Sequence, residues 1–449
     1  MRDNQEELHL YNVRLPQDSI GQLFSITIKN GVYETIQKQT DSARLLHGAK
    51  ISKLSISDVT EQNAIDVEGR FLLPSFIDIH THLDKAFSLT SVPNRSGTLQ
   101  EAIRNYSEKA ASFSEHEIKA RVRKAALQSL SYGTTHIRTH VNFELDMNEK
   151  LALSHLQAVL EVREELRSII SIQVVPMFSY LSSRPKKQID IIEEAVSFGV
   201  DGIGGAPHLS PNSMEDIDFI FQLAEKFGKF IDLHVDEQDD PSICTIEHII
   251  EKTKEYNYQG KVVAGHLCSL SAMNEKRAAT IIEEMAGTKI GAVTLPGANM
   301  YLQGRHDRGV IRRGITRVKE FLNGGVEIAT ASDNVNDPFH PFGRCDLLQI
   351  GLLTAYTAHL GSESELQHVM KMMTETPAGI YGLKNHGVQE KVNASFVLLE
   401  GRDMYQLFAN LSPSRFVYHK GRWVSGTTSE TQFLISEKAV GVGGREDGI

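Results

Sequence analysis

The chain has 449 residues, 41% of them hydrophobic, and a formal net charge of -10 at pH 7. This length and composition favour a soluble globular enzyme with one large core and room for a smaller companion unit. The acidic balance argues against nucleic acid or an anionic membrane as a partner, because both attract basic surfaces, and it favours small-molecule chemistry.

The sequence predicts neither a signal peptide nor a cysteine motif. Residues 1–17 lack the apolar core of a signal peptide, and no window approaches the ~20 apolar residues of a membrane span. The three cysteines, Cys244, Cys268 and Cys345, show no C-x-x-C spacing, which argues against a disulfide framework or a cysteine zinc knuckle. We therefore expect a cytoplasmic protein.

Both ends of the chain contain short runs with β character between turn residues. Residues 1–73 include "SITIKNGVYETI" and "AIDVEGRFLL", and residues 390–449 include "ASFVLLEG" and "RFVYHKGRWVSG". Brief strands separated by Gly and Asn turns are typical of small β units. We expect the two chain ends to form one small β-sandwich domain.

Residues 74–389 have a different texture, in which apolar strand-like runs alternate with longer segments of helical periodicity. The helical segment "IDFIFQLAEKFG" ends at a glycine suited to a C-cap. Eight βα repeats predict an α/β protein with a (β/α)8 TIM-type barrel. The eight runs are "FLLPSFIDIHTH", "TTHIRTHV", "SIQVVPMF", "GVDGIGGAPH", "KFIDLHVDE", "KVVAGHLCS", "KIGAVTLPG" and "VEIATASD".

Candidate metal ligands stand at the ends of three runs. His80 and His82 lie at i and i+2 of a predicted strand, so both side chains share one face. His234 ends the fifth run and Asp333 ends the eighth. The C-terminal strand ends of such barrels meet at the active site. Three imidazoles and a carboxylate suit one divalent ion of the zinc or iron type with a position left open for water.

Further strand-end residues are candidates for proton transfer. Glu237 follows His234 by three residues, and we expect it to move protons between water, substrate and leaving group. His266 ends the sixth run and could polarise a substrate oxygen or the attacking water. His208, at the end of the fourth run, is expected to be structural. That run carries no lysine to bridge a second metal, so a single ion is the simpler interpretation.

The segments "HTHLDK", "PNRSGTL", "HIRTHV", "IDLHVDE", "LQGRHDRGVIRRGITRVKE" and "SDNVNDPFHPFG" occur in this order over most of the chain. In them the sequence resembles the amidohydrolase superfamily, and within it the cytosine deaminase-like branch. The resemblance implies one Zn2+ or Fe2+ held by His80, His82, His234 and Asp333. It also implies that Glu237 shuttles protons and that His266 helps to activate or orient water.

The chain departs from cytosine deaminases in the expected substrate-binding residues. Ser179 stands near the position of a pyrimidine-binding glutamine, and Asn334 replaces a second aspartate. Lys85 follows "HLD", as it does in the similar N-isopropylammelide amidohydrolases. Its ammonium either donates to a substrate oxygen or points out of the barrel and pairs with Asp84. Gln303 of "YLQGR" is a further candidate for holding the ring.

The hypothesis from the sequence is a metal-dependent hydrolytic deaminase of a cytosine-like nitrogen heterocycle, in which Glu237, His266 and Asp333 are catalytic. The alternative enzyme is an N-alkylammelide amidohydrolase that releases an alkylamine. The alternative from a different class is a non-catalytic barrel that binds a heterocycle or a metal. A small heterocycle is the expected partner, and a symmetric homo-oligomer is expected by analogy with other barrels.

Overall fold

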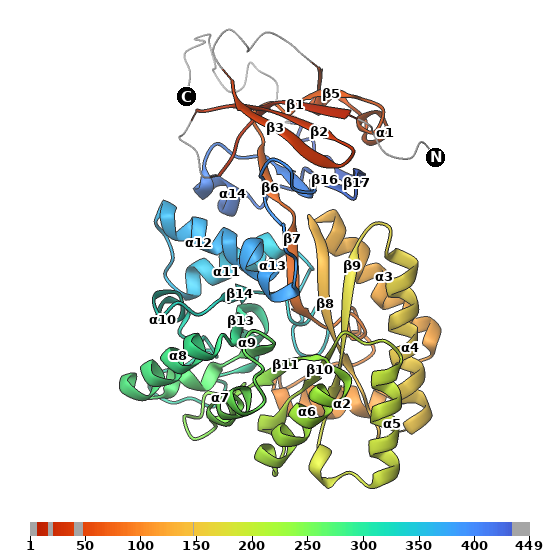
Figure 1. The fold of residues 1–449 in the computed structure, drawn as a ribbon, viewed down its shortest axis with the longest axis vertical. Coiled ribbons are helices and arrows are strands. Elements are labelled where there is room, and N and C mark those ends of the chain that lie inside the picture. Colours follow the sequence, from red (N-terminus) through yellow and green to blue (C-terminus); the bar gives the residue numbers. More distant parts are fainter. Residues whose placement is uncertain (1–6, 17–20, 40–47, 147, 433–449) are drawn as a thin grey trace.

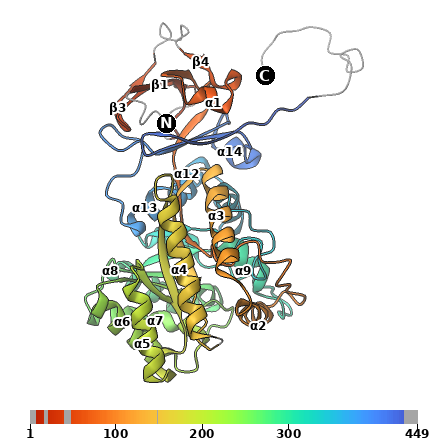
Figure 2. The same ribbon diagram turned by 90° about the vertical axis from the view of Figure 1, so that its right-hand side faces the viewer.

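The computed structural model describes residues 7–16, 21–39, 48–146 and 148–432, which form an elongated molecule (Figure 1). A helix-wrapped barrel occupies one end, and two small sheets occupy the other. Figure 2 shows in the perpendicular view that the sheets built by the two chain ends lie together beyond the barrel.

The barrel is one parallel sheet of eight strands whose order in space follows their order in the chain. Each of the eight runs picked out in the sequence overlaps one of these strands, so the predicted barrel is confirmed. A parallel bridge between Thr81 and Asp333 brings the first strand next to the last, and the barrel is nearly closed. The strands are β7 (Phe76–Thr81), β8 (Thr134–Asn142), β9 (Ser171–Phe178), β10 (Gly202–Gly205), β11 (Phe230–Val235), β12 (Val262–His266), β13 (Gly291–Thr294) and β14 (Ile328–Thr330).

Helices cover the outside of the barrel and share its main apolar core. A capping box between Ser114 and Glu117 begins α3, and Gly228, at φ 64°, ends α6 in the left-handed conformation that glycine favours. The helices are α2 (Leu99–Ala110), α3 (Glu115–Ser131), α4 (Glu149–Leu166), α5 (Lys186–Ser197), α6 (Ser213–Phe227), α7 (Thr245–Glu255), α8 (Glu275–Thr288), α9 (Pro296–Leu302), α10 (Val318–Asn323), α11 (Leu347–Thr357), α12 (Glu363–Met373) and α13 (Glu375–Tyr381).

The two small sheets face each other across a separate apolar core that includes Leu8, Ile26, Phe396 and Tyr418. One sheet has the order β3-β2-β1-β5-β4 and the other the order β17-β16-β15-β6, so both chain ends build this unit, as expected. The strands are β1 (Glu7–Val13), β2 (Phe24–Lys29), β3 (Val32–Lys38), β4 (Ala49–Lys50), β5 (Ala64–Asp66), β6 (Phe71–Pro74), β15 (Phe396–Leu399), β16 (Arg415–His419) and β17 (Arg422–Thr427). Short helices α1 (Ile56–Val59) and α14 (Met404–Asn410) accompany them.

The run of residues 71–82 crosses from the small sheets into the barrel. It divides at Ser75 into β6, which pairs with β15, and β7, which pairs with β8. The hydroxyl of Ser75 lies 2.7 Å from that of Thr135 on β8 and 2.6 Å from that of Ser395 next to β15. The two parts of the molecule are therefore joined by buried hydrogen bonds as well as by the chain.

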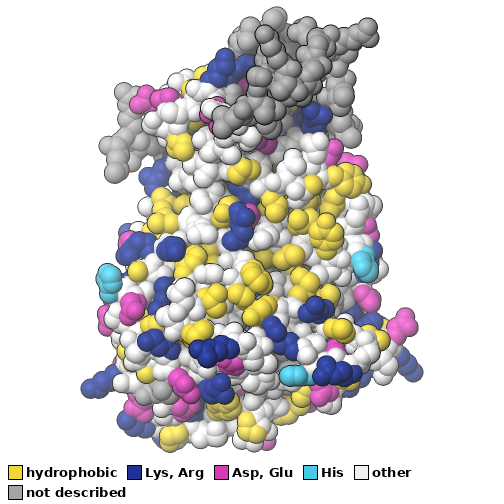
Figure 3. Space-filling model, turned by 180° about the vertical axis from the view of Figure 1, so that it is seen from behind, with side chains coloured by type: hydrophobic (Ala, Val, Ile, Leu, Met, Phe, Trp, Pro, Cys, Tyr) yellow, Lys and Arg dark blue, Asp and Glu magenta, His cyan; other side chains and the backbone are white. Residues whose placement is uncertain are grey.

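The surface of the described residues carries both charged and hydrophobic side chains. No helix among these residues has the length and apolar character needed to cross a membrane. Figure 3 shows hydrophobic side chains across the middle of one face, with Lys and Arg between them. Val310, Phe342 and Tyr356 are exposed apolar side chains. A homo-oligomer stays a prediction.

Candidate active site

A pocket opens where the C-terminal ends of the barrel strands meet. Its inner end is lined by His82, His234, Glu237, His266 and Asp333. Its outer part is lined by side chains from the loops after β8, β9 and β10 and from α2, among them Ile103, Phe143, Tyr180 and Leu209. The loop side of the pocket thus combines apolar side chains with charged ones, among them Asp146 and Arg184, and the strand-end side is polar and titratable.

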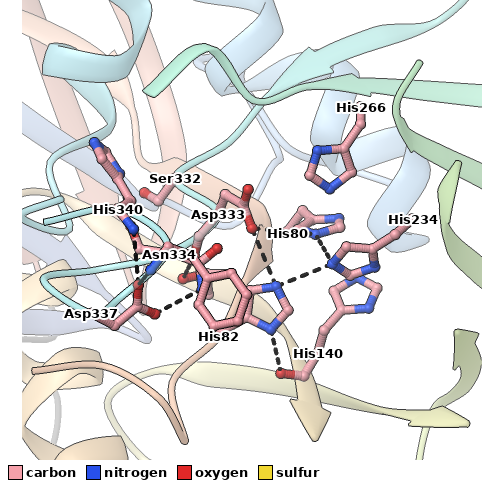
Figure 4. Close-up of polar contacts among 12 residues, drawn as sticks. His80, His82, His140, His234, His266, Ser332, Asp333, Asn334, Asp337 and His340 are labelled. Atoms are coloured by element: carbon pink, nitrogen blue, oxygen red, sulfur yellow. Dashed lines mark hydrogen bonds and ion pairs between the residues drawn. The ribbon is translucent and has the colours of Figure 1, made fainter. Parts of the chain in front are cut away.

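Four side chains at the inner end turn nitrogen and oxygen atoms toward one point (Figure 4). The Nε2 atom of His234 lies 3.2 Å from Nε2 of His80 and 3.2 Å from Nε2 of His82. The Oδ1 atom of Asp333 lies 3.2 Å from Nε2 of His82 and 3.8 Å from Nε2 of His80. Ligands of a tetrahedral metal at bond lengths of about 2.1 Å stand about 3.4 Å apart. The spacing fits a divalent metal.

The protonation states support the same interpretation. Burial lowers the pKa of His80, His82 and His234 well below 6.5, so the three imidazoles are neutral. One ring nitrogen of His234 faces two others, and a single proton or lone pair cannot satisfy both. Among the described residues, no donor forms a hydrogen bond with Oδ1 of Asp333. A cation of the zinc or iron type would satisfy all four atoms.

The backbone that carries these ligands also closes the barrel. The amide of Asp333 donates to the carbonyl of His80 at 2.9 Å, and the amide of His82 donates to the carbonyl of Asp333 at 3.1 Å. Asp333 has φ 57°, a left-handed conformation that is unusual for a side chain with a Cβ. The two hydrogen bonds hold this strained residue against β7, and so they fix the aspartate beside the histidine pair.

Hydrogen bonds to backbone carbonyls orient the imidazoles of His82 and His208. Nδ1 of His82 donates to the carbonyl of His140 at 3.1 Å, which leaves Nε2 free to bind a metal. Nδ1 of His208 donates to the carbonyl of His234 at 3.1 Å. The structure therefore places His208 behind the fifth strand, and a structural role for it stays a prediction.

Glu237 and His266 lie beside the four-residue cluster. Nδ1 of His266 is 3.7 Å from Oε1 of Glu237, and it accepts a hydrogen bond from the amide nitrogen of Asn299 at 2.9 Å. The proton of His266 is therefore on Nε2. Burial, and then the nearby Asp333 carboxylate, raise the pKa of Glu237 well above 4.5, and burial lowers the pKa of His266 to about 3. A buried acid and a neutral imidazole thus share the inner end of the pocket.

Lys85 lines the pocket and is only 4% exposed. Its Nζ lies 4.5 Å from the centre of the Phe339 ring and 5.7 Å from that of Tyr106. Asp84 accepts from the backbone amide of Asn142 at 3.0 Å, and burial raises its pKa while the positive charge of Lys85 lowers it. Lys85 thus lies in the pocket wall, and its contact with a substrate stays a prediction.

The other expected substrate-binding residues occupy different places. Ser179 and Asn334 line the pocket. The amide nitrogen of Asn334 donates to Oδ2 of Asp337 at 2.7 Å, so this aspartate sets the orientation of the amide. Gln303 is not among the residues that line this pocket, and its amide nitrogen donates to the carbonyl of Glu237 at 2.9 Å. Gln303 thus supports the loop of Glu237 and does not face the substrate space.

Two buried residues next to the cluster were not found from the sequence. His140 stacks on His80 with ring centres 4.0 Å apart, and Asp232 lies on β11 at the i−2 position from His234. Both side chains are completely buried. The spacing R-x-H in "HIRTHV" and D-x-H in "IDLH" could have indicated them, because i and i+2 positions of a strand share a face.

A barrel that gathers three histidines and an aspartate at its strand ends is an architecture of metal-dependent hydrolases. The sequence profile of the amidohydrolase family matches residues 71–425, so the chain belongs to this family. It is accordingly a hydrolase of carbon–nitrogen bonds within the amidohydrolase superfamily.

Characterised proteins with similar sequences and structures act on nitrogen heterocycles. The chain is 30% identical over 365 residues to the pterin deaminase of Rhizobium rhizogenes, covering 80% of this chain and 81% of that protein. It is 28% identical to the N-isopropylammelide isopropyl amidohydrolase of a Pseudomonas species, covering 78% and 85%. The crystal structure of 5-methylcytosine deaminase from Klebsiella pneumoniae with 5-fluorocytosine is similar, with a TM-score of 0.84, 25% identity, and coverage of 96% and 100%.

Proposed function

We propose that this chain is a metal-dependent aminohydrolase that cleaves an exocyclic carbon–nitrogen bond of a cytosine-like heterocycle and releases ammonia or an amine. The observation that carries the proposal is the convergence of His80, His82, His234 and Asp333 on one point, with Glu237 beside them. A divalent cation at this point would supply the Lewis acidity that makes water a nucleophile near neutral pH.

The residues around the metal point would divide the proton transfers between them. Glu237 would take one proton from the attacking water and deliver it to the ring nitrogen next to the reacting carbon. It would then take the second proton from the hydroxyl group formed on that carbon and give it to the departing amine. His266 keeps its proton on Nε2, because Asn299 occupies Nδ1, and it would donate a hydrogen bond to the oxygen that becomes the ring carbonyl. Both side chains line the pocket, as this sequence of transfers requires.

Three polar groups are present in the pocket to hold the ring. Lys85 would donate to a carbonyl or an anionic oxygen of the heterocycle, and the aromatic rings beside its ammonium favour the cation. Asn334, oriented by Asp337, would present its amide to the polar edge of the ring. Ser179 stands on the wall formed by the loop after β9.

An N-substituted ring is the second candidate substrate, and the shape of the pocket favours it. The pocket extends from the catalytic residues to the apolar side chains of Phe143, Tyr180 and Leu209. An alkyl group or a second ring on the heterocycle would be accommodated there. Both the N-isopropylammelide amidohydrolase and the pterin deaminase named above act on compounds of this larger kind, to judge by their names.

The Glu237→Gln variant tests the proposal, since it retains the shape of the side chain and removes its acidity. We expect turnover to fall by at least about 100-fold while the bound metal, measured by elemental analysis, stays at the level of the native chain. Glu251→Gln, a change of the same kind at a 71% exposed side chain, should leave turnover unaltered. Undiminished turnover by Glu237→Gln would refute the proton-transfer role.

The substrate itself is found by measuring ammonia and amine release from a panel of heterocycles. The panel comprises cytosine, isocytosine, creatinine, pterins, ammelide and N-alkylammelides. Rapid release from a substituted or bicyclic ring, with little from cytosine, is the expected result. If metal is bound but no compound of the panel is hydrolysed, a non-catalytic binding role becomes the better interpretation.

A further inference from the structure

A network of buried polar side chains runs through the barrel beneath the proposed metal site. Arg138 and His140 lie at i and i+2 of β8, and Asp232 lies on β11. Nη1 of Arg138 donates to Oδ2 of Asp232 at 2.7 Å, and Nε2 of His140 lies 3.4 Å from Oδ1 of the same carboxylate. The three side chains are 1% exposed or less. Barrel interiors are usually filled by branched apolar residues, so the presence of this polar network needs a structural or functional explanation.

The end of this network nearest the proposed metal site, His140, contacts the metal ligand His80. The rings of His80 and His140 are stacked, with centres 4.0 Å apart and planes 30° apart. A ring nitrogen of His80, a ring nitrogen of His140 and a carboxylate oxygen of Asp232 lie within 4.8 Å of one another. Within the described residues, Nδ1 of His80, both ring nitrogens of His140 and Oδ1 of Asp232 are buried without a hydrogen-bond partner. Unpaired donors and an unpaired acceptor therefore face the same small space.

The opposite end of the network, Arg138, is held by the backbone of α13. Nη2 of Arg138 donates to the carbonyl of Ile380 at 2.9 Å, and its Nε donates to Oε1 of Gln173 at 2.9 Å. Gln173 in turn donates to the carbonyl of Tyr381 at 3.0 Å. The guanidinium has thus no freedom to move, and the carboxylate of Asp232 is held in one position.

The charge of this network argues against a second metal ion. The guanidinium of Arg138 already compensates the carboxylate of Asp232, and the imidazoles beside it are fully buried. A divalent cation there would stand next to a fixed positive charge in a medium of low dielectric constant, which is strongly unfavourable. The network is better suited to accept a hydrogen bond from a neighbouring donor, and the imidazole N–H of His80 is such a donor.

We propose that Arg138, Asp232 and His140 form a positioning unit for the metal ligand His80. The fixed carboxylate of Asp232 favours the tautomer of His80 that carries its proton on Nδ1, so that Nε2 keeps its lone pair for the metal. His140 supports the ring by stacking, and a carboxylate oxygen of Asp232 lies within 4.8 Å of a ring nitrogen of His80. This inference rests on the metal site of the proposed function.

The test compares two charge-removing variants at buried Arg–Asp pairs of the same kind. Asp232→Asn removes the carboxylate of the proposed unit. Asp346→Asn is the matched control, because Asp346 forms a completely buried bidentate pair with Arg415, away from the pocket. Metal affinity is measured by competition with a chromophoric chelator, and the visible absorption spectrum of the Co2+-substituted protein reports the geometry of the ligands. Neither measurement requires a substrate.

We expect Asp232→Asn to bind Zn2+ about 10- to 100-fold more weakly than the native chain and to alter the Co2+ spectrum. Asp346→Asn should be destabilised but retain the native affinity and spectrum. Equal affinities and spectra for the two variants would overturn the inference. If Asp232→Asn does not fold, His140→Asn is measured in its place, with weaker Zn2+ binding expected and native affinity again overturning the inference.

The same measurements separate this inference from the proposed function. A native chain that binds Zn2+ and hydrolyses no heterocycle would refute the deaminase proposal and leave the affinity comparison decisive. A native chain that deaminates a heterocycle, together with native Zn2+ affinity in Asp232→Asn, would support the function and refute the positioning unit.

Discussion

Nε2 of His82 lies 3.2 Å from Oδ1 of Asp333, and the backbone amide of His82 donates to the backbone carbonyl of Asp333 at 3.1 Å. The two residues stand just beyond the ends of the first and the last barrel strands, β7 and β14. The same contact thus closes the barrel and brings two proposed metal ligands together. Barrel stability and the assembly of the site are therefore expected to depend on each other.

Metal binding should stabilise the folded chain, because ligands from β7, β11 and β14 would be joined by one ion. A ligand that binds only the folded state adds about 4 kcal/mol at a free concentration 1,000-fold above its Kd. We expect removal of the metal by a chelator to lower the midpoint of thermal unfolding by several degrees. Calorimetry of the native chain with and without Zn2+ checks this.

Asp333→Ala serves as the control for the metal effect. The variant lacks the carboxylate ligand but keeps the three histidines, so chelation should lower its unfolding midpoint by less than that of the native chain. A midpoint of the native chain that does not depend on metal would contradict the prediction, and an equal shift in Asp333→Ala would exclude Asp333 as a ligand.

The barrel and the cluster at its strand ends were predictable from the sequence because both follow local rules. Apolar runs with helical segments between them identified all eight strands, and the period of two placed His80 and His82 on one face. The place of Gln303 was not predictable, because its contact with the carbonyl of Glu237 joins two loops. The orientation of Asn334 likewise depends on Asp337, which the turn of the following loop brings back to it.

Lys85 places a charge in the pocket wall between aromatic rings. Burial raises the pKa of Asp84 and of Asp337, and the nearby ammonium of Lys85 opposes this shift in both buried carboxyl groups. We therefore expect Lys85→Met, which retains the length of the side chain, to be less stable than the native chain by about 1–3 kcal/mol. Its kcat/KM for the true substrate should fall by about 100-fold, with metal content unaltered. Urea unfolding and steady-state kinetics measure both effects.

A matched change at the surface separates the charge of Lys85 from a general effect of methionine. Lys186→Met, at a side chain that is 79% exposed, should alter neither the kinetics nor the stability appreciably. Native kcat/KM in Lys85→Met would show that the ammonium does not contact the substrate.

Asn334→Asp would place a second carboxyl group against Asp337. The amide nitrogen of Asn334 is now 2.7 Å from Oδ2 of Asp337, and burial raises the pKa of Asp337 to about 7. Two carboxyl groups at this distance retain a shared proton that the unfolded chain loses near pH 4. The folded variant then binds more protons than the unfolded one, so its free energy of unfolding falls as the pH rises.

We expect Asn334→Asp to be less stable than the native chain by about 1–3 kcal/mol at pH 8, and by less at pH 5. Urea unfolding at the two pH values gives both differences. A stability difference that is the same at pH 5 and pH 8 would show that the two side chains do not interact in the variant.

A group of buried histidines lies at the other end of the barrel, between β8 and the small sheets. The ring of His419 is 5.2 Å from that of His136, which in turn is 6.1 Å from His386. Nδ1 of His419 bonds to the hydroxyl of Ser395 at 2.9 Å. Burial, followed by the positive charge of Lys420, lowers the pKa of His419 to about 3.

His419 should make the chain less stable in acid. Its pKa is about 6.5 in the unfolded chain and about 3 in the folded one, so the unfolded state binds more protons between these values. The free energy of unfolding is therefore expected to gain up to about 1.4 kcal/mol per pH unit from this residue as the pH rises from 3 to 6.5, and nothing above that range.

His419→Asn can keep the bond to Ser395 and should show a correspondingly flatter pH dependence in urea unfolding. His116→Asn, at an exposed position, should follow the native curve. Parallel curves for the native chain and His419→Asn would mean that His419 is charged in the folded protein, contrary to its burial.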